Sequence, residues 1–146
     1  MYQVNSKYHI LEHVHEVHGI IEDGDTTFIK IFMEKRLISM TEIQLRSFIK
    51  SLRPSDEEVR KQLDYGYSWD GQAAILFEIR PQWNDPSKTL QLEFAKLRYV
   101  KSNKTWKLYW LRGSRKWEAY DPQPESAKLQ ELLTDIKNDE YACFFG

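Results

Sequence analysis

Basic and aromatic side chains are interleaved between residues 96 and 118 of this 146-residue chain. The stretch holds eight lysines and arginines and a single acid, Glu118, so it carries a net charge of +7 within a chain whose net charge is −1. Cations hold phosphate groups and aromatic rings stack on bases, so this mixture favours binding of single-stranded nucleic acid or another polyanion. The competing interpretation is a solvated sheet face with cross-strand ion pairs.

Successive strand residues point to opposite faces of a sheet, which predicts where these side chains gather. Phe77, Trp106 and Trp117 mark an apolar face that helices should cover. The opposite, polar face is predicted to contain Glu78, Arg80, Lys96, Arg98, Lys107, Tyr109, Glu118 and Tyr120. Its four basic residues would bind phosphates, and its two tyrosines would stack on bases.

Catalysis is the alternative of a different class. A metal-dependent nuclease needs two carboxylates that hold Mg²⁺ and a cation for the transition-state charge. Glu78, Arg80 and Lys107 would supply such a site, although neither aspartate of the preceding hairpin is placed beside Glu78 by this pattern. A metal-free ribonuclease would instead use the basic residues and Tyr109 to position a 2′-hydroxyl. We favour binding over catalysis and expect no cofactor.

Trp83 stands in a predicted loop between Pro81 and Pro86. It is either a plug over the sheet edge or an exposed anchor for a protein partner. All four histidines lie near the N-terminus, and some pairs have chelating spacing on a helix or a strand. We interpret them as surface residues and predict no metal site; they are His9, His13, His15 and His18.

The elements that position these residues follow from periodicity and turn signals. A helix is predicted to begin with Thr41 as its N-cap and to end before Pro54, and Ser55 with Glu58 forms a capping box for a short second helix. Period-two segments then predict strands over 63–69, 72–81, 90–101, 105–112 and 116–120. Prolines at 122 and 124 should end the sheet, and an amphipathic helix follows over 126–137.

This order predicts an α+β fold with N-terminal helices, a five-stranded antiparallel meander and a C-terminal helix packed on one sheet face. Residues 40–146 would form the main domain. Residues 1–39 would be an extension, with a helix or strand over 10–21 and a strand over 27–33. An edge strand from the extension could pair two chains into a homodimer.

The chain is similar to a known family in several segments. They are DYGY at 64–67, FEIRPQWNDP at 77–86, YVKS at 99–102, TWKLYW at 105–110, KW at 116–117 and DEYACFFG at 139–146. From about residue 40 to 146 the chain resembles the bacterial domain-of-unknown-function family 3024. The resemblance implies a fold unit and a bacterial source, and it implies no reaction.

Composition and segment lengths predict the cellular setting. Cys143 is the single cysteine, so no internal disulfide is expected. The first residues lack a signal-peptide pattern, and the apolar runs are too short to span a membrane. We therefore expect a cytoplasmic protein that does not enter membranes.

Overall fold

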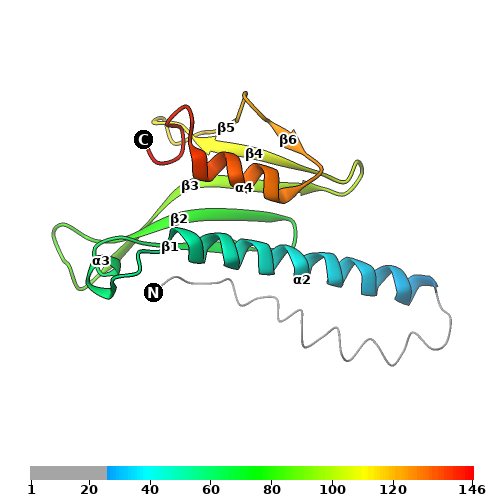
Figure 1. The fold of residues 1–146 in the computed structure, drawn as a ribbon, viewed down its shortest axis with the longest axis horizontal. Coiled ribbons are helices and arrows are strands. Elements are labelled where there is room, and N and C mark those ends of the chain that lie inside the picture. The colour runs from blue at the N-terminus through cyan, green and yellow to red at the C-terminus, as the bar shows by residue number, and fades with distance from the viewer. Residues whose placement is uncertain (1–25) are drawn as a thin grey trace.

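A computed structural model describes residues 26–146, which form an α+β fold with one antiparallel sheet (Figure 1). The sheet contains strands β1 to β6, and helices α2, α3 and α4 flank it in the chain. The elements are α2 (Thr26–Leu52), α3 (Glu57–Arg60), β1 (Asp64–Trp69), β2 (Ala73–Pro81), β3 (Thr89–Val100), β4 (Thr105–Leu111), β5 (Trp117–Ala119), β6 (Glu125–Ser126) and α4 (Leu129–Asn138).

Strands β1 to β5 lie side by side in chain order, which confirms the predicted meander. The sheet has one strand more than predicted, because the chain returns after Pro122 and Pro124 and the short β6 pairs with β4. Strands β5 and β6 therefore share the same edge of β4. A bulge at Phe94 shifts the pairing between β2 and β3, where Leu76 pairs with Ala95 but Phe77 pairs with Glu93.

The turn between β1 and β2 shows why the sequence forms a hairpin there. Gly71 has a φ of 92°, a conformation in which a side chain would be strained. The Asp70 carboxylate accepts hydrogen bonds from the backbone amides of Gln72 and Ala73, at 2.8 and 2.7 Å. The turn therefore sets the register in which Trp69 pairs with Ala74.

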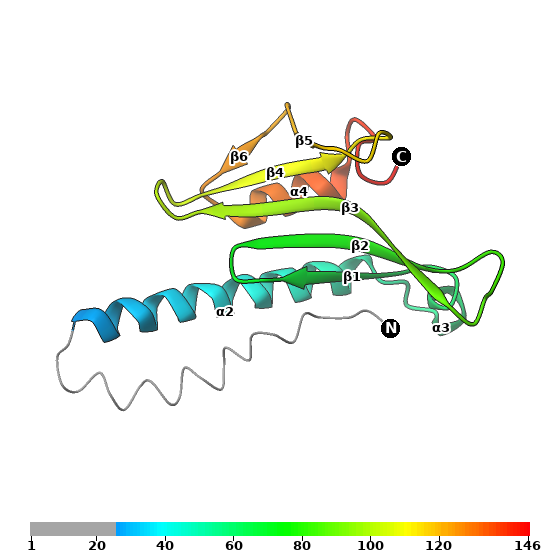
Figure 2. The ribbon, with the colours of Figure 1, turned by 180° about the vertical axis from the view of Figure 1, so that it is seen from behind.

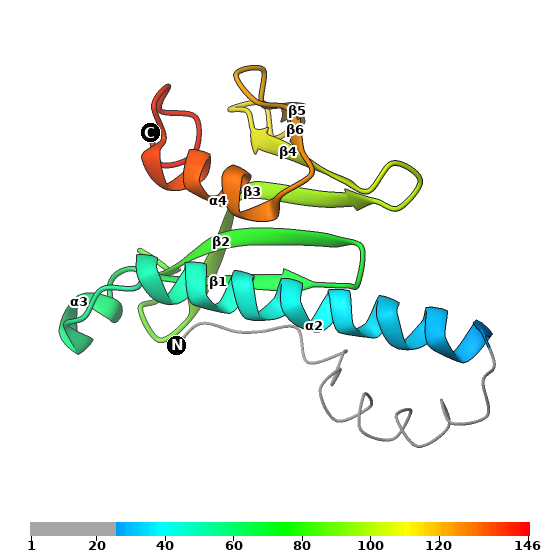
Figure 3. The ribbon, with the colours of Figure 1, turned by 45° about the vertical axis from the view of Figure 1, so that its right-hand side comes forward.

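Helices α2 and α4 cover the same face of the sheet (Figures 2 and 3). The buried core lies between them and the strands, and Tyr67, Trp69 and Trp106 contribute its largest side chains from the sheet. The Trp69 and Trp106 ring centroids are 5.8 Å apart. The C-terminal segment closes one end of this layer, where Phe144 packs 5.0 Å from Tyr120 and Phe145 packs 5.0 Å from Phe94.

Helix α2 corrects two predictions near the N-terminus. The predicted strand over 27–33 is wrong, because these residues form the first turns of a helix of 27 residues, about 40 Å long. Thr41 is not an N-cap but a helical residue that is buried. The stretch from residue 26 to 52 contains neither glycine nor proline, and extending a helix costs less than starting a new one. The helix continues without a break across residues 39 and 40, where the sequence predicts the boundary between the extension and the main domain.

Helix α3 forms where it was predicted, with a different cap. Its N-cap is Asp56 rather than Ser55, and the Asp56 carboxylate accepts a hydrogen bond of 2.9 Å from the Glu58 amide. The predicted element over 10–21 and the four histidines lie outside the described residues. In the described part of the chain, no helix is apolar over a length that could cross a membrane.

Candidate polyanion-binding face

The sheet face opposite α2 and α4 carries a group of basic and aromatic side chains on β3 and β4. We call this group, which consists of Lys96, Arg98, Lys107 and Tyr109, the basic face. Lys96 pairs with Tyr109 across the two strands, and its ammonium Nζ lies 5.6 Å from the centroid of the Tyr109 ring. This distance is within the range of a cation–π contact, so the lysine head lies over the Tyr109 ring.

Arg98 and Lys107 form the neighbouring cross-strand pair of the basic face. Two like charges directly opposite each other destabilise a sheet. In residues 26–146, no ion pair joins either of them, or Lys96, to a carboxylate. On the edge of β4 that faces away from β3, Glu125 of β6 is the cross-strand partner of Lys107, but the two do not form an ion pair. The cross-strand ion pairs of the competing interpretation are therefore missing from the described part of this face.

Two predicted members of the polar face, Glu78 and Arg80, lie on the other face. The register pairs Glu78 with Tyr65, and residues Tyr65 and Tyr67 of β1 share the helix-covered side. There Arg80 forms a 2.9 Å ion pair with Glu78, whose side chain is only 16% exposed. Strand β2 carries apolar residues on both sides, so its own alternation does not reveal its core face. The aromatic alternation in β1 is the signal that does.

The predicted face of Tyr120 is also wrong. Its side chain is buried in the core against Phe144, and burial, then the neighbouring Cys143 and the acids of α4 and the C-terminal segment, raise the pKa of its hydroxyl. All side chains of β5 face the side opposite to the one predicted. Glu118 pairs with Trp110 on the helix-covered side, and Trp117 pairs with Leu111 on the side of the basic face.

The β4–β5 loop explains this reversal. A two-residue turn at Gly113 and Ser114 would pair Trp117 with Trp110. Instead Arg112 pairs with Lys116 around a three-residue loop, in which Arg115 takes the left-handed conformation with a φ of 69°. One added residue shifts the register by one and turns every side chain of β5 to the other face. Trp117 is thus a site residue that the sequence pattern assigned to the core.

Trp83 is not a plug, since its side chain is 92% exposed. The loop that carries it is held by internal hydrogen bonds: the Asp85 carboxylate accepts from the Ser87 hydroxyl at 2.6 Å, and the Gln82 amide donates to the Lys88 carbonyl at 2.9 Å. This loop joins β2 to β3 at the opposite end of the sheet from the β3–β4 turn (Figure 1). Trp83 is therefore not part of the basic face.

The carboxylates considered for a metal nuclease do not converge. The Arg53 guanidinium binds both oxygens of Asp64, at 2.8 and 3.0 Å, and Asp70 forms the hairpin turn described above. Glu78 lies on the other side of the sheet from Asp64, as the alternation along β1 and its pairing with β2 show. Within residues 26–146, no three side chains of His, Cys, Asp or Glu form a group that could hold a metal ion.

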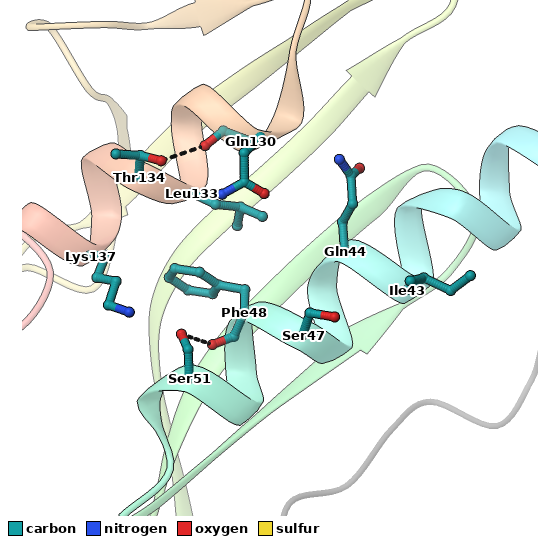
Figure 4. Close-up of a pocket in the computed structure, with 9 residues that line it drawn as sticks. All are labelled: Ile43, Gln44, Ser47, Phe48, Ser51, Gln130, Leu133, Thr134 and Lys137. Atoms are coloured by element: carbon teal, nitrogen blue, oxygen red, sulfur yellow. Dashed lines mark hydrogen bonds between the residues drawn. The ribbon is translucent and has the colours of Figure 1, made fainter.

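A groove of about 420 Å³ separates α2 from α4 (Figure 4). Phe48 and Leu133 form its apolar floor. Its hydroxyls are already used within their helices: Ser51 donates to the Phe48 carbonyl at 2.6 Å, and Thr134 donates to the Gln130 carbonyl at 2.9 Å. Among the described residues that line this groove, Lys137 is the titratable one, and no acid or histidine stands beside it to form an acid–base pair.

Comparison with known proteins gives a family. The sequence model described as "Domain of unknown function (DUF3024)" matches residues 33–146. The chain belongs to the DUF3024 family. The match begins inside α2, before residue 40, and includes the whole sheet, the basic face and α4. No curated protein and no solved structure matches this DUF3024 chain.

Proposed function

We propose that this DUF3024 protein binds an extended polyanion, with nucleic acid as the favoured example, through its basic face. The observation that carries the proposal is the direct pairing of Arg98 with Lys107, with no ion pair to a carboxylate among the described residues. Such a pair costs stability in the free protein, and a bound phosphate would remove that cost.

Two further observations support a polyanion rather than a single small anion. Lys96 and Arg98 alternate along β3, and Lys107 faces them from β4, so the cations are spread over the sheet instead of converging on one point. The turn at one end of these strands adds Lys101 and Lys104, both exposed. A chain of phosphates, unlike an isolated one, can contact this whole strip. The proposal includes a bacterial cytoplasmic setting for this binding.

A salt-dependent titration tests the proposal. A labelled single-stranded oligothymidylate of about 12 nucleotides is titrated with the protein, and binding is followed by fluorescence anisotropy. If the three cations of the basic face each contact a phosphate, the logarithm of the affinity should fall against the logarithm of the salt concentration with a slope of about −2. Lys96→Gln should weaken binding about five-fold at low salt and reduce the slope by about 0.7.

Lys50→Gln is the matched control for this titration. Lys50 is exposed on α2, on the opposite side of the sheet, and its substitution removes the same charge. Equal losses in Lys96→Gln and Lys50→Gln would show that net charge, not the basic face, governs binding. No binding to any polyanion at low salt would refute the proposal.

The nuclease alternatives are tested with the same samples. Each end point is run on a denaturing gel, with single-stranded RNA in place of DNA and with and without Mg²⁺. Cleaved RNA that forms without metal, and that does not form with Lys107→Gln, would turn the proposal toward a ribonuclease that uses Lys107 and Tyr109. For the metal-dependent version, the separation of Glu78 from Asp64 by the sheet offers no support.

Trp83 favours a second candidate function, an interaction with a protein. An indole that is 92% exposed on an internally hydrogen-bonded loop presents a large apolar surface with little ordering cost on binding. The test is an affinity purification with the protein and with Trp83→Ser, followed by reconstitution of any retained protein in purified form. A purified partner whose affinity drops at least about ten-fold with Trp83→Ser would support this role. Equal retention of the partner by the unsubstituted protein and by Trp83→Ser would refute this role of Trp83.

A further inference from the structure

Tyr109 lies in a cross-strand row that leaves one side of its ring uncovered. Lys96 is its neighbour on β3, and Ala119 is its neighbour on β5. Ala119 is exposed and has the smallest side chain that still follows strand alternation. A larger residue at this position would lie against the ring and cover it. The row therefore has a cation on one side of the tyrosine and open space above the alanine on the other.

Trp117 adds a second ring to the same face. It lies two residues before Ala119 on β5, so both side chains point to the side of the basic face. Relative to Tyr109 it is a diagonal cross-strand neighbour, and such neighbours are about 7–8 Å apart, within reach of aromatic side chains. Both rings are partly exposed. Tyr109 and Trp117 thus form a two-ring platform beside Lys96, Arg98 and Lys107.

We infer that the polyanion bound by this face is a single-stranded nucleic acid, with unpaired bases that stack on Tyr109 and Trp117. This inference rests on the proposed polyanion function and names its ligand. The cations of β3 and β4 hold the backbone, and the rings of β4 and β5 hold successive bases. Open antiparallel sheets that combine these two kinds of side chain bind unpaired bases in this way, with little preference for sequence.

Double-stranded nucleic acid fits the same face poorly. The five strands of the meander lie about 4.8 Å apart, so the sheet is about 19 Å wide, whereas the major groove of B-DNA is about 12 Å wide. The sheet cannot enter that groove face-on. The bases of a duplex are also stacked on one another, and the two rings have no free base to contact. A duplex would therefore use the cations and leave the platform without a partner.

The test compares three polyanions at the same low salt concentration: oligothymidylate of about 12 nucleotides, the corresponding duplex and inorganic polyphosphate. We expect the single strand to bind most tightly. Tyr109→Leu and Trp117→Leu should each weaken binding of the single strand about ten-fold and leave polyphosphate binding within about two-fold. Phe at position 109 keeps a ring and should restore most of the affinity that Leu loses.

Ala119→Leu provides a variant that removes no ring. It changes the exposed position of the short strand β5, and it should weaken single-strand binding by covering the Tyr109 ring. Thermal melting of every variant checks that the sheet is intact. If Lys96→Gln weakens all three ligands but Tyr109→Leu, Trp117→Leu and Ala119→Leu change none selectively, base stacking is refuted while polyanion binding stands. Equal affinity for single strand and duplex would also overturn the inference. Failure of every ligand to bind would refute the proposed function itself.

Discussion

Arg98 and Lys107 are direct cross-strand partners, so two positive charges occupy one pair of the β3–β4 ladder. The pair lies on the sheet face opposite α2 and α4, next to the pair formed by Lys96 and Tyr109. Opposite charges at such positions stabilise a sheet and like charges destabilise it. This pair lowers the stability of the fold but concentrates positive charge. Substituting one of its residues should therefore raise stability and lower the affinity for polyanions.

Arg98→Gln should therefore stabilise the protein while weakening its binding to polyanions. We expect the free energy of unfolding to rise by about 0.5 kcal/mol at low salt, because the repulsion with Lys107 is removed. The gain should shrink at high salt, where exposed charges are screened. Urea denaturation at two salt concentrations measures both effects. A loss of stability at low salt, with Lys50→Gln unchanged, would contradict this account.

Glu125→Gln should strengthen polyanion binding. Glu125 is the β6 partner of Lys107, so the sheet register places it beside the basic face. Removing its charge should tighten binding of the labelled oligothymidylate about two- to five-fold at low salt, the effect of one exposed charge pair. Glu140→Gln removes the same charge from an exposed position and serves as the control. Equal effects of the two substitutions would argue against a local role of Glu125.

Asp64→Asn should destabilise the fold in a pH-dependent way. Asp64 is 1% exposed, and although burial alone would raise its pKa, hydrogen bonds from Arg53 and the Tyr65 amide lower the pKa below the usual 3.8. A lowered pKa in the folded state adds stability that is fully present above the unfolded-state pKa and is lost as the pH falls through the folded-state pKa. We expect a loss of about 2–3 kcal/mol near neutral pH, less than for a fully buried pair, because Arg53 reaches solvent.

The difference between Asp64→Asn and the unsubstituted protein should shrink progressively below about pH 4, as Asp64 becomes protonated. Urea denaturation at a series of pH values measures this difference. Glu58→Gln is the control, because the Glu58–Lys61 pair is exposed and should contribute little. A difference that does not change with pH would show that packing, rather than the charge of Asp64, causes the effect.

Asp135→Asn should stabilise the fold at neutral pH, whereas Asp64→Asn should destabilise it. Burial, with Glu131 and Glu140 nearby, raises the pKa of Asp135 above 3.8. Its buried Oδ2 accepts no hydrogen bond from the described residues, and it lies in the last turn of α4, where the helix dipole disfavours an anion. A raised pKa in the folded state means that stability is greatest below the unfolded-state pKa and falls as the pH rises toward the folded-state pKa.

At neutral pH we therefore expect Asp135→Asn to raise the free energy of unfolding by about 0.5–1 kcal/mol. The advantage should shrink as the pH falls and vanish well below the unfolded-state pKa of 3.8, where the aspartate is neutral in both states. Thermal melting at both pH values measures it. Asp121→Asn makes the same chemical change in an exposed turn and should alter neither melting temperature. A lower melting temperature of Asp135→Asn at neutral pH would refute the prediction.

Most of the sheet could be predicted from the sequence, because alternation and turn residues act locally. Asp70 and Gly71 specify the first hairpin through hydrogen bonds and a backbone conformation that the residue types themselves require. The faces of β2 and β5 could not be predicted in the same way. In β2, apolar residues occupy both sides. In β5, Gly113 suggests a two-residue turn, whereas Arg115 takes the left-handed position.

The candidate site reflects the same limit. Lys96, Arg98, Lys107 and Tyr109 share one face as their alternation predicts, because all four lie on two strands joined by one turn. Arg80, Tyr120 and Trp117 were misplaced, because their faces depend on how one strand aligns with the next. A shift of one residue in that alignment exchanges the two faces of a strand. The N-terminal part of α2 was misassigned for another reason, since its β-branched and aromatic residues favour a strand locally and the continuing helix overrides them.

The meander also has a consequence for how this chain folds. From β1 to β5 every strand pairs with the one that follows it, and the connections contain between three and seven residues. Closing such short loops costs little entropy, so the hairpins should form rapidly and in the order of synthesis. Helix α4 is made after the strands, and until it leaves the ribosome β4 presents Trp106 and Leu108 to water. The nascent sheet is then most prone to aggregation just before α4 is complete.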